Sequence, residues 1–260
     1  MSASAETLPI LYRDDSLVAV HKPAGLLVHR TGLDRHETRF ALQIVRDQIG
    51  RTLWPLHRLD KGTSGLLLFA LDREAGRIVS GQFEQGEVEK SYLAVVRGHP
   101  PERGEIDHPL VRLADPYAGA PGGPAQAALT RYRRLATVEL PHRVDRYPSS
   151  RYALLELKPA TGRWHQLRRH LKHLSHPIIG DATHGKGRHN RLFQALFDSQ
   201  RLLLVATRLR LLHPVSGQTL HLEAPPSGDF QRVLDALGWG EAWRIQPAAC
   251  LDESICASRE

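Results

Sequence analysis

Short apolar runs separated by turn residues are the main pattern along this chain. The runs are rich in Leu and Val and bounded by Gly, Pro, Asp or Ser, which is typical of buried strands. They predict strands at residues 17–20, 66–71, 92–96, 152–157, 202–206, 209–212 and 219–222. The runs at 202–206 and 209–212 read as two strands paired with each other, and residues 213–217 (HPVSG) as a turn into the last strand.

Helical spacing of apolar residues appears in three other segments. Leu42, Val45 and Ile49 share one face of a predicted helix that ends at Gly50. Asp72 is a candidate N-cap for a second helix that ends near Gly86, with its apolar face at Ala75, Ile78, Val79 and Phe83. The third helix is strongly basic, and its apolar stripe consists of Trp164, Leu167, Leu171 and Leu174.

Strands and helices are mixed without a regular strand–helix–strand rhythm. This order favours an α+β fold with a mixed, largely antiparallel central sheet and flanking helices. We expect a flexible N-terminus at residues 1–8, a single domain at 9–245 and a disordered tail at 246–260. Residues 99–128 are rich in Pro and Gly and are expected to form a surface excursion of that domain.

The net charge of +7 points to a polyanionic partner, because Lys and Arg displace counterions from phosphates. A basic surface that serves only solubility is the alternative. The two cysteines, Cys250 and Cys256, cannot cross-link the body of the chain, which fits a reducing cytoplasm. The first residues lack a secretory signal, and no apolar stretch approaches ~20 residues, so we expect no membrane span.

One carboxylate stands out in the segment HRLDKGTSG at residues 57–65. Asp60 lies between Arg58 and Lys61 on a predicted turn, directly before the apolar run 66–70. Nearby cations favour an ionised carboxylate, which can act as a nucleophile, a base or an electrostatic partner. An ordinary surface ion pair is the competing interpretation.

The basic segment GRWHQLRRH at residues 162–170 carries the second group of candidates. Arg168 follows Leu167 and should lie at the edge of the buried face, where it suits a partly buried carboxylate. Arg169 and Lys172 should point outward and, with Arg163, contact phosphates, although a merely solvated basic face is also consistent with the pattern. Tyr92 opens a strand, so it either packs in the core or stacks on a base.

Several other functional classes lack the residues they need. The histidines clustered at 165–189 suggest zinc, but no acidic residue lies between positions 163 and 179, so satisfied or solvated imidazoles are expected instead. Phosphate-binding and serine-esterase motifs are missing from the sequence. A glycoside hydrolase would need two carboxylates flanking the bond, and beyond Asp60 the candidate is Asp181 in a separate turn.

Taken together, five segments resemble pseudouridine synthases of the ribosomal large subunit synthase A type, in that family's order. They are KPAGLLVH at 22–29, residues 57–70, KSYLAVVRG at 90–98, residues 162–170 and HPIIGD at 176–181. The resemblance covers roughly residues 9–224 and implies a catalytic cleft that converts a uridine of structured RNA to pseudouridine. It implies no S4-type RNA-binding domain, no cofactor and no metal, and a cytoplasmic monomer that flips its target base out of the helix.

The resemblance also assigns roles to single residues. It implies that Asp60 is the essential aspartate, that Arg58 enters the RNA helix beside the flipped base, and that Tyr92 packs on uracil. It implies that Arg168 pairs with Asp60 and that Leu204 walls the uracil pocket. The family usually has a histidine after that position, where this chain has Val205.

Within the family, residues 45–50, 146–152 and 165–170 resemble a member that modifies uridine 65 of tRNA. Ribosomal RNA is an alternative substrate. A different class, a non-catalytic RNA-binding or folding factor, would retain its function when Asp60 is replaced by Ala.

Overall fold

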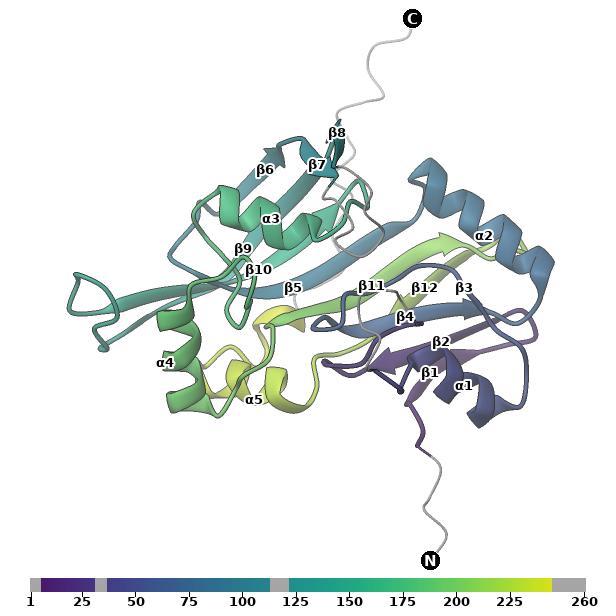
Figure 1. Cartoon of the computed structure of the whole chain (residues 1–260), viewed down its shortest axis with the longest axis horizontal. Coiled ribbons are helices and arrows are strands. Elements are labelled where there is room, and N and C mark those ends of the chain that lie inside the picture. Colours follow the sequence, from purple (N-terminus) through teal and green to yellow (C-terminus); the bar gives the residue numbers. More distant parts are fainter. Residues whose placement is uncertain (1–5, 31–36, 113–121, 245–260) are drawn as a thin grey trace, which may run out of the picture.

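A computed structural model describes residues 6–30, 37–112 and 122–244 of the chain (Figure 1). The predicted tail at 246–260, with both cysteines, lies outside these residues, as does most of the predicted flexible N-terminus. The strands are β1 (Ile10–Arg13), β2 (Leu17–Lys22), β3 (Trp54–Pro55), β4 (Ser64–Ala70), β5 (Glu89–Arg97), β6 (Arg103–Asp107), β7 (Leu110–Arg112), β8 (Gly123–Gln126), β9 (Leu129–Leu140), β10 (Ser150–Pro159), β11 (Leu204–Leu212) and β12 (Thr219–Glu223). The helices are α1 (Ala41–Ile49), α2 (Arg73–Gln85), α3 (Gln166–His173), α4 (Gly187–Phe197) and α5 (Gly228–Ala236), with a 3-10 turn at Ala242–Arg244.

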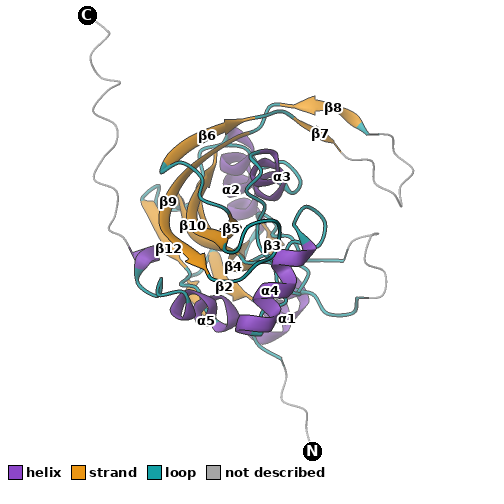
Figure 2. Ribbon diagram, turned by 90° about the vertical axis from the view of Figure 1, so that its left-hand side faces the viewer, coloured by secondary structure: helices purple, strands orange, loops and turns teal. Residues whose placement is uncertain are grey.

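One ten-stranded sheet organises the molecule. Its strands follow the order β1-β2-β4-β11-β5-β10-β9-β6, with β12 also paired to β11 and β3 to β4. Its ladders are antiparallel except the short contact between β4 and β11, where Val205 and Ala206 lie opposite Ser64 and Gly65. Strands β7 and β8 form a separate ribbon beyond β6 (Figure 2). The expected α+β fold with a largely antiparallel sheet is confirmed.

The side chains of the central strands alternate between the two faces of the sheet, so the core has a separate part on each face. Successive side chains of a strand point to opposite faces. Ala94 and Leu155 therefore pack with Leu171 of α3, whereas Val95 and Leu154 pack with helices α4 and α5 on the other face (Figure 1). A third cluster joins β1, β2 and β4 to helices α1 and α2. The long apolar runs of β4, β5 and β10 follow from this covering of both faces.

Gly65 allows β4 to approach β11 closely just after the Asp60 turn. Its φ of +104° lies in a region that L residues rarely adopt. A Cβ at this position would stand 2.0 Å from the carbonyl oxygen of Ala206. Glycine is therefore required where the turn enters the sheet.

The predicted ends of two helices are confirmed. Helix α1 ends at Gly50 with φ +67°, and α2 is capped by the Asp72 side chain, which accepts from the Ala75 backbone N–H at 2.8 Å. The third helix begins later than its apolar stripe suggests, because Trp164 lies before it and is 40% exposed. Within the described residues, no helix has the length and apolar character to cross a bilayer.

The prediction of two paired strands at 202–206 and 209–212 is wrong. Both runs belong largely to the single strand β11, whose antiparallel neighbours are β5 and β12. The polar residues Thr207 and Arg208 interrupt the apolar run, and the register with β5 shifts at this point. Thr207 nevertheless stays buried and donates its hydroxyl to the Ser91 carbonyl at 3.1 Å. A bulge, not a turn, explains the interruption.

Part of the segment expected as a surface excursion forms regular structure. Strand β6 pairs with β9 at the edge of the central sheet, and residues 110–112 and 123–126 form the β7–β8 ribbon. Residues 113–121 lie outside the described chain. Strand β9 was not predicted because arginines interrupt its apolar positions, and helices α4 and α5 were not predicted either.

Candidate active site

Asp60 lies on the turn between β3 and β4, at the base of a cleft of about 1000 Å³. The Thr63 backbone N–H donates to the Asp60 carbonyl at 3.0 Å, which closes the turn. His57 supports its start, because its Nε2 accepts from the Leu68 backbone N–H at 3.1 Å. The Asp60 side chain remains 22% exposed. A sheet-anchored turn thus presents a carboxylate to the cleft.

A buried lysine ties the Asp60 turn to the segment after β2. Lys22 is fully buried, and its Nζ donates to the carbonyls of Pro23, Leu26 and Lys61 at 2.9, 2.7 and 3.3 Å. Gly25 strengthens this connection, since its N–H also donates to the Lys61 carbonyl, at 2.7 Å. Burial lowers the pKa of Lys22 to about 7, with the charge of Arg201 acting in the same direction. Lys22 therefore holds the Asp60 turn in place through the backbone of that turn.

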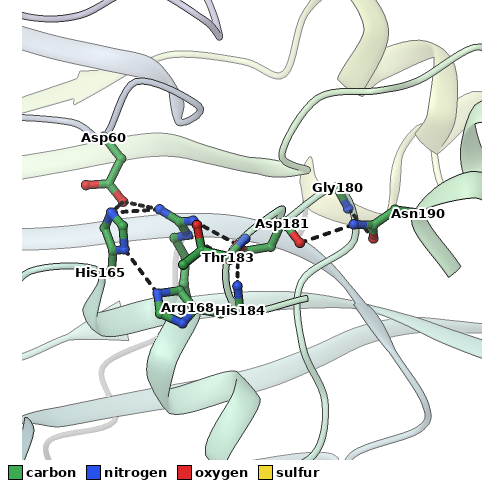
Figure 3. A network of polar contacts seen from close by, with 8 residues as sticks. All are labelled: Asp60, His165, Arg168, Gly180, Asp181, Thr183, His184 and Asn190. Carbon is green, nitrogen blue, oxygen red and sulfur yellow. Dashed lines mark hydrogen bonds and ion pairs between the residues drawn. The ribbon is translucent and has the colours of Figure 1, made fainter. Parts of the chain in front are cut away.

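Arg168 of α3 lies between two carboxylates (Figure 3). Its Nη1 donates to Asp60 Oδ2 at 3.3 Å, the contact that the family resemblance implies. Its Nε and Nη2 donate to Asp181 Oδ2 and Oδ1 at 2.7 and 2.8 Å, which is the bidentate geometry of a strong ion pair. Burial by itself would lower the pKa of Arg168, but the hydrogen bonds and charge of Asp181 raise this pKa overall.

Asp181 is the anchor of this network. Its side chain is 1% exposed, and its Oδ1 also accepts the backbone N–H groups of Thr183 and His184 at 2.9 and 2.8 Å. Burial alone would raise the pKa of Asp181, but these hydrogen bonds and Arg168 lower it. Asn190 of α4 holds the same turn, because its amide donates to the Asp181 carbonyl at 3.1 Å and its oxygen accepts the Gly180 N–H at 2.9 Å. Sequence reasoning gave Asp181 no such role.

His165 is a second neighbour of Asp60 that sequence reasoning missed. Its Nε2 accepts from Arg168 Nη1 at 2.8 Å and lies 3.6 Å from Asp60 Oδ2. Nδ1 therefore carries the proton and donates to His184 Nε2 at 3.1 Å. Burial lowers the pKa of His165 to about 4, so the ring is neutral near pH 7. The sequence offered this residue only as a possible zinc ligand.

The cleft brings most of the predicted site residues together. Its lining includes Arg58, Asp60, Tyr92, Arg163, Arg168 and Leu204. Tyr92 is half-buried on β5, and burial together with the charge of Asp60 raises the pKa of its phenol. Arg169 and Lys172 lie further along α3 and are not part of this lining. The predicted site is thus one cleft plus a neighbouring basic surface.

Leu204 and Val205 occupy opposite faces of β11. Leu204 packs on the α3 side and lines the cleft. Val205 is fully buried with the residues beneath α4 and α5. An imidazole at position 205 would therefore point into that core and away from Asp60.

The clustered histidines separate into different environments. His165 pairs with His184, whereas His173 stacks on His108 and His189 contacts Tyr152 and Asp145. Among residues 6–30, 37–112 and 122–244, no three His, Cys, Asp or Glu side chains are grouped to hold a metal ion.

This geometry agrees with comparisons to known proteins. The family model described as RNA pseudouridylate synthase matches residues 16–173, which include Asp60, Tyr92 and Arg168. The chain belongs to this family. It is an RNA pseudouridine synthase, an enzyme that isomerises uridine in RNA.

Relatives and solved structures of the same family cover most of the chain. It is 49% identical over 242 residues to tRNA pseudouridine synthase C of Vibrio cholerae, which covers 92% of this chain and 99% of that protein. It is 51% identical over 236 residues to the protein of the same name from Salmonella typhi, covering 89% and 90%. The structure of human RNA pseudouridylate synthase domain containing 4 has a TM-score of 0.65 at 27% identity, covering 88% and 93%.

Proposed function

We propose that this pseudouridine synthase acts on tRNA and that its target is uridine 65. The relatives named tRNA pseudouridine synthase C support the substrate, since they match almost the whole chain. The choice of uridine 65 rests on the resemblance of residues 45–50, 146–152 and 165–170 to a member with that specificity. The protein works as a monomer without a cofactor.

The observation that carries the catalytic assignment is the position of Asp60. This carboxylate is exposed to the cleft, while Arg168 beside it is held by the buried Asp181. The reaction breaks the N1–C1′ bond of the uridine, joins C5 to C1′, and moves the C5 proton away while N1 gains one. Asp60 promotes the first step by attacking C1′ or by taking a proton from C2′.

The other residues of the cleft bind and orient the substrate. Flipping a nucleotide from its stack costs a few kcal/mol, and Arg58, exposed at the cleft, offsets part of this cost by filling the vacated space. The Tyr92 ring and Leu204 pack on the flipped uracil. Because its pKa is raised, the Tyr92 phenol stays protonated at pH 7, and a base near it takes the C5 proton. Arg163, Arg169 and Lys172 contact phosphates.

Incubation of unmodified tRNA with the wild type and Asp60→Asn tests this function. Pseudouridine is detected by chemical derivatisation, because isomerisation leaves the mass of the RNA unchanged. We expect modification at uridine 65 by the wild type, none by Asp60→Asn, and similar tRNA affinity for both proteins. Glu74→Gln, which changes an exposed acid on α2, is the matched control and should remain active. Activity of Asp60→Asn near the wild-type rate would exclude the catalytic assignment, and modification of ribosomal RNA alone would exclude the tRNA assignment.

A deuterium label at C2′ of the target uridine separates the two roles of Asp60. Removal of the C2′ proton predicts a primary isotope effect on the single-turnover rate, whereas attack at C1′ leaves that bond intact and predicts none of comparable size.

A further inference from the structure

Trp164 is a large aromatic side chain left exposed in the cleft. It precedes α3, lines the same cleft as Asp60, and is 40% exposed. Neither the isomerisation chemistry nor the packing of the core uses this ring. Exposed tryptophan in a functional cleft points to a ligand with an apolar flat surface.

The imidazole of His165 covers one face of the Trp164 indole. The rings of Trp164 and His165 stack with centroids 3.9 Å apart and an angle of 24° between their planes. His165 in turn is held by Arg168 and by His184, so the support is fixed on two sides. With this face covered, Trp164 is still 40% exposed and lines the cleft.

The backbone of His165 adopts an unusual conformation that favours the stacking of the two rings. His165 has φ +52°, a left-handed conformation that residues other than glycine rarely adopt. This conformation precedes the first turn of α3 and places Trp164 and His165 side by side. Such strained positions persist where the surrounding contacts over-determine them, and they concentrate at functional sites.

The charged side chains near the Trp164 ring indicate which class of planar ligand would stack on it. Arg58 and Arg163 are exposed residues of the same cleft, and the Asp60 carboxylate is matched by Arg168. Neither arginine is paired with a carboxylate among the described residues, although Arg163 Nε donates to the Ala127 carbonyl at 3.1 Å. An aromatic ring beside such cations suits a nucleotide, whose base stacks while its phosphate meets the cations.

We propose that Trp164 is a stacking platform for a nucleobase of the RNA, next to the uridine that enters the Asp60 site. The proposal rests on the proposed function for the presence of RNA in the cleft, and it adds a binding residue that the reaction itself does not require. Base stacking contributes affinity without regard to the identity of the base, because every base has a π face.

The affinity of Trp164 variants for RNA measures the contribution of the ring. Replacing an aromatic platform by Ala weakens binding by about 5- to 150-fold in proteins that bind single-stranded nucleic acid. We expect a rise in Kd of this size for Trp164→Ala and Trp164→Leu, and near wild-type affinity for Trp164→Phe. The slope of log Kd against log salt should stay the same, since no charge is lost.

A double-mutant cycle identifies the partner. Abasic nucleotides are introduced one at a time around the target uridine of a tRNA stem-loop, and each RNA is titrated with wild type and Trp164→Ala. At one position the abasic change should weaken binding to the wild type but add nothing in Trp164→Ala. Leu196→Ala is the matched control, because Leu196 of α4 is 39% exposed and lies outside the cleft lining. It should show no such coupling.

The outcomes distinguish this inference from the proposed function. Additive losses at every abasic position, or an unchanged Kd for Trp164→Ala, overturn the platform even if the wild type modifies tRNA. Failure of the wild type to modify tRNA overturns the proposed function, while the cycle, which measures binding alone, still reports on Trp164. Loss of folding is excluded by equal unfolding midpoints of Trp164→Ala and wild type.

Discussion

Arg168 makes its closest contacts with Asp181, and not with Asp60. The guanidinium reaches Asp181 through two hydrogen bonds of 2.7 and 2.8 Å, but approaches Asp60 through one of 3.3 Å. Asp181 is 1% exposed, whereas Asp60 is 22% exposed. One carboxylate therefore anchors the arginine, and the arginine leaves the other accessible to substrate.

Asp181→Asn tests the anchor. Removing one partner of a buried ion pair costs about 3–5 kcal/mol. Asp60, at 3.3 Å, compensates the remaining charge of Arg168 only in part. We expect a loss of this order in the free energy of unfolding, measured by urea denaturation, and a slower single-turnover rate at temperatures where the protein is folded. Glu74→Gln removes an exposed partner of Arg77 and should leave both quantities unchanged. Wild-type stability of Asp181→Asn would contradict the anchor.

Lys22→Met tests the buried link to the Asp60 turn. The substitution removes this donor from the carbonyls of Pro23 and Leu26, whereas the Lys61 carbonyl keeps its hydrogen bond from the Gly25 N–H. A buried group left unsatisfied costs about 1–3 kcal/mol. We expect a lower unfolding midpoint and a lower kcat, with little change in tRNA affinity. Lys158→Met, at an exposed position of β10, is the control. Equal kcat for Lys22→Met and wild type would separate this lysine from the Asp60 turn.

The stability of the protein should fall between pH 6.5 and pH 4 in a way that depends on His57. Burial lowers the pKa of His57 to about 4, and its Nε2 already accepts a backbone hydrogen bond. The unfolded state takes up the proton near pH 6.5, whereas the folded state resists until about pH 4, so acid favours unfolding. The expected loss between pH 7 and pH 5 is up to about 2 kcal/mol.

Urea denaturation of wild type and His57→Gln at both pH values checks this dependence. The variant cannot titrate at position 57, so its free energy of unfolding should change less between the two pH values. An equal change in both proteins would assign the pH dependence to other groups.

Salt dependence tests the basic surface of α3. Each phosphate contact contributes about 0.9 to the slope of log affinity against log salt. Arg169→Gln and Lys172→Gln should each reduce that slope by about one unit without changing the rate at saturation. Arg77→Gln, on the exposed side of α2, should leave it unchanged. Unchanged slopes for both α3 variants would show that this surface does not contact phosphates.

Local chemistry explains which parts of the fold were predictable. Asp72 and Gly50 mark helix ends through contacts within a few residues, so their pattern is visible in the chain itself. Asp60 was recognisable because it stands between cations before a buried run. Thr207 and Arg208 misled the prediction, since a polar pair in a strand resembles a turn until the partner strand shows the bulge.

The sequence by itself determined the α+β class and the basic character, since these depend on composition and on local periodicity, and its resemblance to a known family singled out Asp60, Tyr92 and Arg168. Only the tertiary structure decided that Asp181 anchors Arg168 and that His165 supports Trp164 beside Asp60. These contacts join side chains from different elements, and their strength comes from burial and bidentate geometry. Neither property belongs to any single segment of the chain.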